Sequence, residues 1–202
     1  MKNLEIQLSN KLEPLWKLFR EVHNITCHYV EAHNYEDCPY FYNERAIISL
    51  MSGAAWRMGF YALEEYSSSK KHEENDYSGR VDLYISSDEK SFVFESKIHW
   101  ENVSTKYSLD NANKTFQKAV SDTQKIDREE ADLRVAVLFV IPYYPEHFKN
   151  SGIGNVNEYG LLLKNNLKLD GIISIFPDCC RGLNGGNGYY YPGFFMLLKI
   201  VA

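Results

Sequence analysis

The sequence has few of the residues on which small extracellular or fibrous proteins depend. Four cysteines in 202 residues are too few for a disulfide framework. Twelve glycines and six prolines are too few for a collagen-like or low-complexity chain. We therefore expect free thiols and an ordered globular fold, which a chain of this length can stabilise with a hydrophobic core alone.

Long apolar runs and an excess of positive charge are also missing. No apolar run reaches the ~18 residues of a membrane-spanning helix, and the first residues, MKNLEIQLSNKLEPLW, lack the apolar core of a signal peptide. These absences predict a soluble, cytoplasmic protein without a membrane partner. The 22 basic and 27 acidic residues give a net charge of −5. A polyanion could therefore be bound only through a local basic patch or through divalent cations.

Helices are indicated by apolar residues that recur at helical spacing. Three segments have this spacing: residues 11–32, 44–65 and 109–126. Asn43 is a favourable N-cap for the second helix. The polar segments between these elements, 33–42 and 67–76, are interpreted as loops.

Strands are indicated by short apolar or alternating runs next to turn residues. They are expected at residues 80–86, 91–99, 133–141, 171–176 and 193–201. The first two form a hairpin, and the unbroken apolar run of the third is typical of a strand covered on both faces. Strands interleaved with helices predict an α/β fold, with a central mixed β-sheet flanked by helices. We expect one domain over residues 1–202, with an N-terminal helix at 11–32, a core at roughly 43–141 and C-terminal strands in 171–201.

The hairpin carries the residues that point to chemistry. Asp82 lies in its first strand, and Glu95, Ser96 and Lys97 lie in its second. Because alternate side chains of a strand share a face, Glu95 and Lys97 should point the same way, with Ser96 opposite. Two converging carboxylates suit Mg²⁺, and a neighbouring lysine can orient or deprotonate a water molecule. The alternative is a cross-strand salt bridge on a solvated sheet face.

The pattern Asp82-x(12)-Glu95-x-Lys97, across a hairpin that follows an amphipathic helix, resembles the motif of the PD-(D/E)XK nuclease superfamily. The resemblance covers roughly residues 43–141. It implies a restriction-endonuclease-like fold and a nuclease that hydrolyses DNA phosphodiester bonds with Mg²⁺ or Mn²⁺. Small nucleases of this kind often work as a homodimer or within a larger defence or repair complex.

The resemblance also implies roles for individual residues. Asp82, Glu95 and the carbonyl of Ser96 would bind the metal, and Lys97 would position the attacking water. Glu44 matches a glutamate that many members carry on the helix before the sheet. The sequence departs from the motif in having Val81 where a proline is usual. It also shows no clear strand between the second helix and residue 80.

The helix at 109–126 offers a polar face that could contact nucleic acid. Its candidate residues are Lys114, Lys118, Lys125, Gln117 and Gln124. The alternative is a solvated face, since the acidic residues Asp110, Asp122 and Asp127 are interspersed with the lysines.

Two other readings of the function stay open. The chain could be a non-catalytic binding module for a protein or a nucleic acid on the same fold. It could also be a zinc hydrolase built on Cys27, His28, His33 and Cys38, although their spacing matches no usual zinc pattern. His99 shares the face of Glu95 and Lys97, and it could contact substrate or cap the strand.

Overall fold

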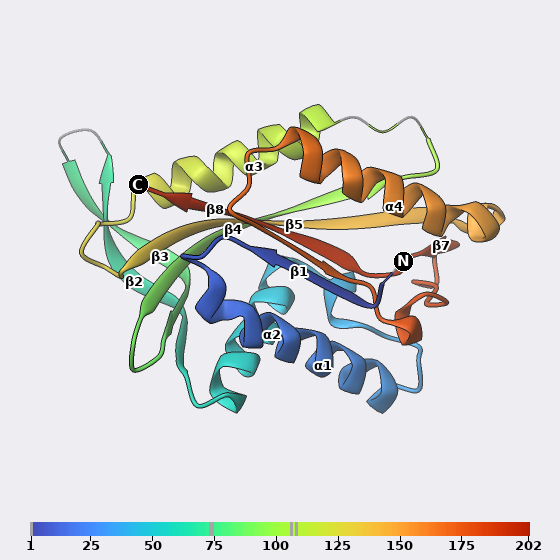
Figure 1. Ribbon diagram of the computed structural model, residues 1–202, viewed down its shortest axis with the longest axis horizontal. Helices are drawn as coiled ribbons and strands as arrows, with labels where there is room; N and C mark the ends of the chain where they lie inside the picture. The colour runs from blue at the N-terminus through green and yellow to red at the C-terminus, as the bar shows by residue number, and fades with distance from the viewer. Residues whose placement is uncertain (1, 73–74, 106, 108) are drawn as a thin grey trace.

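The computed structural model describes residues 2–72, 75–105, 107 and 109–202, and these fold around one mixed eight-stranded sheet with helices on both faces (Figure 1). This architecture confirms the predicted α/β class. Across the described ranges, no helix is both long and apolar enough to cross a membrane.

Seven strands form the path of the sheet in the order β1-β6-β8-β5-β4-β3-β2, and β7 pairs with β5 beside it. The strands are β1 (Leu4–Leu8), β2 (Tyr61–His72), β3 (Asn75–Ser86), β4 (Ser91–Asn102), β5 (Leu133–Pro145), β6 (Gly171–Ile175), β7 (Tyr189–Tyr190) and β8 (Phe194–Val201). Among the strands of the described residues, only β4 and β5 pair in parallel, because α3 connects them across the sheet.

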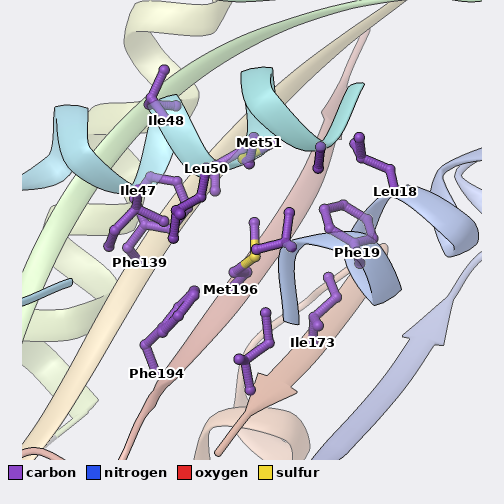
Figure 2. Close-up of a cluster of buried hydrophobic side chains, with 14 of the residues drawn as sticks. Leu18, Phe19, Ile47, Ile48, Leu50, Met51, Phe139, Ile173, Phe194 and Met196 are labelled. Carbon is purple, nitrogen blue, oxygen red and sulfur yellow. The ribbon is translucent and has the colours of Figure 1, made fainter. Parts of the chain in front are cut away.

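The helices divide between the two faces of the sheet (Figure 1). Helices α1 (Trp16–Ala32) and α2 (Glu44–Arg57) cover one face, and α3 (Leu109–Gln124) and α4 (Lys149–Asn166) cover the other. Figure 2 shows part of the first core, where Phe19 and Met51 from the helices meet Phe139 and Met196 from the strands.

Strand β5 contributes to both cores. Val137 and Phe139 are buried in the core under α1 and α2, whereas Ala136 and Leu138 are buried under α3 and α4. The unbroken apolar run therefore follows from burial on both faces, as the sequence predicts.

The predicted helix at 44–65 is too long, and the predicted loop at 67–76 is wrong. Asn43 caps α2 as expected, since its Oδ1 accepts the Ala46 N–H at 3.0 Å. The helix then ends at Arg57, and Gly59 takes up a positive φ of 77° before β2 begins at Tyr61. The expected loop instead lies in β2 and β3, with residues 73–74 outside the described residues. A charged segment can form a strand here because β2 is an edge of the sheet.

The remaining differences are near the N-terminus and after β5. The N-terminal helix begins at Trp16 after a 3₁₀ turn, Glu13–Leu15, rather than at residue 11. Strands β1 and β7 and helix α4 were not predicted. Helix α4 was missed because glycine is unfavourable in helices, and α4 contains Gly152 and Gly160. Both are needed because α4 packs closely on aromatic rings: a Cβ at Gly152 would collide with Tyr144, and one at Gly160 with Phe195.

With β2 included, residues 44–145 follow the order α2-β2-β3-β4-α3-β5. The strand that the sequence did not reveal between α2 and Arg80 is β2. This order puts the N-terminus of α2 and the hairpin residues of interest on neighbouring elements.

Candidate functional site

The candidate site lies where β3 and β4 separate. Their pairing runs only from Leu83 opposite Phe94 to Ser86 opposite Ser91. One residue before this ladder begins in β3, the Asp82 carboxylate accepts the backbone N–H of Ser96 at 2.7 Å. A side chain thus takes the place of the next backbone hydrogen bond, and it fixes Asp82 against β4.

Ser96 joins two carboxylates. Its Oγ lies 2.9 Å from Glu44 Oε1 and 2.9 Å from Asp82 Oδ2. A hydroxyl has one proton and so can donate to only one of them at a time. Burial raises the pKa of Glu44, and the charge of Asp82 adds to this effect against the opposing hydrogen bond from Ser96. The sequence assigned Ser96 only a carbonyl role, so its hydroxyl is a contact that the motif does not reveal.

Glu95 is buried on the opposite side of β4 and is paired with Lys70 of β2. Lys70 Nζ lies 2.6 Å from Glu95 Oε1, and the two side chains are only 10% and 5% exposed. Burial and the negative charge of Asp82 nevertheless raise the pKa of Glu95 to about 7, because they outweigh the opposing effect of Lys70. Lys70 was missed because it falls in the segment interpreted as a loop.

The sequence carries no clear signal for Lys70, because residues 67–72 are all polar and do not alternate with apolar residues. Tyr66 and Ser68 both donate hydrogen bonds to Glu130, at 2.7 Å each, and Lys70 follows them at the next alternate position. In the folded strand these alternate side chains share one face.

Lys97 is held as a cation. Its Nζ donates to the carbonyl of Ser96 at 2.8 Å and lies 3.1 Å from Asp122 Oδ2 in α3. Burial alone would lower the pKa of Lys97, but the hydrogen bond and charge of Asp122, together with Glu44 and Asp82, outweigh burial and raise it. Lys97 is therefore suited to orienting a ligand or stabilising negative charge rather than to accepting a proton.

Asp122 links the site to α3. It pairs with Lys125 at 2.8 Å as well as with Lys97, and the two lysines lower its pKa although burial opposes them. Of the residues expected on the polar face of this helix, Lys125 is therefore drawn toward the site. The others are exposed: Lys114, Gln117, Lys118 and Gln124.

Glu95 and Lys97 share one face of β4 and Ser96 lies on the other, as predicted. The structure adds that the first face meets α3 and the second meets α2. Asp82 contacts Ser96 instead of the side chains of Glu95 or Lys97. Its charge still acts on both of them. The site thus consists of two adjoining halves, with Glu44, Asp82 and Ser96 in one and Glu95 and Lys97 in the other.

The groups that could bind a metal here, Asp82, Glu95 and the carbonyl of Ser96, all offer oxygen atoms. Oxygen ligands are the type preferred by hard cations such as Mg²⁺ or Mn²⁺. The positions of these oxygen atoms, however, do not match those around a bound ion. In the part of the chain that the structure describes, no group of three or more His, Cys, Asp or Glu residues is placed to hold a metal ion. Glu95 is turned to Lys70, and Asp82 is turned to Ser96. Binding of an ion would require Glu95 to exchange its lysine partner for the ion.

The cysteine and histidine cluster considered for zinc does not assemble. His33 stacks on Tyr29 with ring centroids 4.0 Å apart, and Cys38 is buried in the core. All four cysteines are free. Burial raises the pKa of Cys27 to about 12, which makes its thiol a poor metal ligand and nucleophile.

His99 continues the polar face of β4 beyond Lys97. Its Nε2 lies 2.8 Å from Glu101 Oε2, and this oxygen also accepts the Tyr159 hydroxyl at 3.3 Å. The sequence pointed to His99 through its position in the strand period, whereas its two partners were missed.

No protein-family model matches the chain, and it has no match among curated proteins or solved structures.

Proposed function

We propose that the chain is a metal-dependent nuclease that hydrolyses DNA phosphodiester bonds and belongs to the PD-(D/E)XK superfamily. The observation that carries the proposal is the meeting of Asp82 with the Glu95-Ser96-Lys97 segment at the point where β3 and β4 separate. The order α2-β2-β3-β4-α3-β5 and the contact of Glu44 with Ser96 support the same conclusion.

Asp82, Glu95 and the carbonyl of Ser96 would hold a Mg²⁺ or Mn²⁺ ion. The chemistry that such an ion supplies is polarisation of the phosphate and stabilisation of the leaving oxygen. The backbone N–H and the hydroxyl of Ser96 keep Asp82 oriented, and Glu44 shares the hydroxyl with it. Glu95 would leave Lys70 for the ion, and its negative charge would then be neutralised by the ion instead of by the lysine.

Lys97 supplies a fixed positive charge beside the phosphate. Its two partners, Asp122 and the Ser96 carbonyl, orient the ammonium group before the substrate arrives. Such preorganised charge stabilises negative charge that develops on phosphate oxygens or on the attacking water.

The exposed residues of α3 extend this positive charge beyond the site. Lys114 and Lys118, with Gln117 and Gln124 beside them, would contact the phosphate backbone of DNA without reading its sequence. The protein would act in the cytoplasm, where thiols stay reduced, and this agrees with the four free cysteines. It would work there as a homodimer or within a larger complex.

The test is cleavage of plasmid and single-stranded DNA with Mg²⁺, with Mn²⁺ and with EDTA. Wild-type protein and a Lys164→Ala control, which changes an exposed lysine of α4, should both cut DNA in a metal-dependent way. Lys97→Ala and Glu95→Ala should lose the activity. Cleavage that survives EDTA, or that is unchanged in Lys97→Ala, would contradict the proposal.

The second candidate is a non-catalytic binding module on the same fold. The observation that favours it is that Glu95 and Lys97 already have charged partners in Lys70 and Asp122. In this case calorimetric titration would detect no binding of Mn²⁺, and DNA would be bound without being cut.

A further inference from the structure

Strand β4 has an open edge beyond the candidate site. Its ladder with β5 continues to Asn102, whereas its ladder with β3 ends at Phe94. Over the described ranges, no strand pairs with this edge after that point. The side chains at alternate positions on the α3 side are all ionisable, namely Glu95, Lys97, His99 and Glu101.

A polar row is unexpected on β4, because this strand lies inside the sheet and helices cover both faces of the sheet. Ile98 and Trp100, at the intervening positions, pack against the core under α1 and α2. Burial on both faces would favour apolar residues throughout the strand. The row therefore requires an explanation other than core packing.

His99 is the member of this row that is best prepared for a ligand. Its side chain is only 14% exposed, and Nε2 is fixed by Glu101, which is itself held by Tyr159 of α4. Nδ1, in contrast, has no hydrogen-bond partner among the residues that the structure describes. A carboxylate that orients one ring nitrogen and leaves the other available is typical of histidines that bind or react.

We infer that His99 binds the phosphate next to the one that is cleaved. The inference rests on the proposed nuclease function and specifies its substrate as a polynucleotide strand that lies along the open edge of β4. Residues two apart in a strand are separated by about 6.6–6.8 Å, which is comparable with the spacing of successive phosphates. If Lys97 contacts the scissile phosphate, His99 would lie beside the adjacent phosphate of the same strand.

Each ring nitrogen has a defined role in this contact. Protonated histidine donates from both nitrogens, so Nε2–H would donate to Glu101 while Nδ1–H donates to a non-bridging phosphate oxygen. Glu101 and Tyr159 are positioning residues, because they set the orientation of the ring without touching the substrate.

The kinetic test compares two substrates that differ in the neighbouring phosphate. One is a dinucleotide with a single phosphodiester, and the other is a longer single-stranded DNA oligonucleotide. His99→Asn should raise KM for the oligonucleotide about tenfold or more, the value expected for loss of a hydrogen bond to a charged group. It should leave kcat nearly unchanged and KM for the dinucleotide unaffected. His147→Asn, which changes an exposed histidine, is the matched control.

An equal loss on both substrates, or a fall in kcat alone, would show that His99 only supports the fold or the chemistry, and would overturn the inference. Glu101→Gln keeps the shape of its side chain. It should act in the same direction as His99→Asn but more weakly.

A binding experiment separates this inference from the nuclease proposal. Fluorescence anisotropy of a labelled DNA oligonucleotide, with Ca²⁺ in place of Mg²⁺, should show at least tenfold weaker binding to His99→Asn, while its Tm stays close to wild type. If wild type binds the oligonucleotide through His99 but cuts nothing, the nuclease proposal fails and the phosphate contact stands. If binding is absent or independent of His99, the inference fails whatever the activity.

Discussion

Lys70 and Glu95 form a buried ion pair between the edge strand β2 and the site, with Nζ 2.6 Å from Oε1. The carboxylate that the proposed reaction assigns to a metal ion therefore already has a cation beside it. An ion pair in such surroundings has lost most of its hydration, so each partner depends on the other. Lys70 thus acts as an internal counter-ion that a divalent ion would have to replace.

Lys70→Met should destabilise the protein by about 3 kcal/mol or more, because Glu95 stays buried without its cation. Mn²⁺ should then raise the Tm of Lys70→Met more than that of wild type, since the ion no longer competes with the lysine. Thermal denaturation with Mn²⁺ and with EDTA measures both effects. The double variant Lys70→Met/Glu95→Leu should regain stability but lose the response to Mn²⁺. Equal Mn²⁺ responses in wild type and Lys70→Met would contradict competition between the ion and Lys70.

The raised pKa of Glu95 predicts a pH dependence of stability. In the folded protein this pKa is about 7, against an ordinary value of 4.5. Folding therefore favours the protonated form, and the resulting stabilisation is fully present below pH ~4.5 and is lost as the pH rises through ~7. Relative to Glu95→Gln, wild type should lose on the order of 2–3 kcal/mol across this range.

Urea denaturation of both proteins at pH 5 and pH 8, with EDTA present, measures this difference. Other titrating groups are common to the two proteins, so their contributions largely cancel. A constant difference between the two pH values would mean that Glu95 keeps an ordinary pKa.

The hydroxyl of Ser96 contacts the carboxylates of both Glu44 and Asp82, so its removal should take a hydrogen-bond donor from both. Ser96→Ala keeps the backbone N–H that Asp82 accepts but removes the shared hydrogen-bond donor. We expect a loss of about 1–2 kcal/mol in the free energy of unfolding. Adding Glu44→Gln should recover part of it, because one of the two facing negative charges is gone. Ser121→Ala, at an exposed position of α3, should be neutral. A Ser96→Ala protein as stable as wild type would mean that the hydroxyl holds neither carboxylate.

The parts of the fold that the sequence predicted are those where one physical effect dominates. Strand β5 is apolar because both of its faces are buried, and the buried side of α3 repeats at helical spacing. Strand β2 was missed because an edge strand can be charged, and α4 was missed because close packing on aromatic rings requires glycine.

The same distinction applies to the site. Asp82, Glu95 and Lys97 could be placed on adjoining strands from the hairpin alone. Their partners Lys70 and Asp122 could not, because they come from elements that are distant in sequence and meet the hairpin only in the folded protein. The local pattern therefore reveals which groups are charged, while the fold decides how each charge is balanced.

Asp122 is the contact that keeps Lys97 charged, so Asp122→Asn should lower the pKa of Lys97. Burial already acts in this direction, and the carboxylate of Asp122 is the largest of the opposing influences. The acetylation rate of individual lysines, measured by mass spectrometry over a range of pH, reports how much of each amine is neutral. Lys97 should begin to react at lower pH in Asp122→Asn than in wild type, whereas exposed Lys118 should react alike in both. An unchanged profile for Lys97 would mean that Glu44 and Asp82 suffice to hold its charge, and that the link to α3 only orients the side chain.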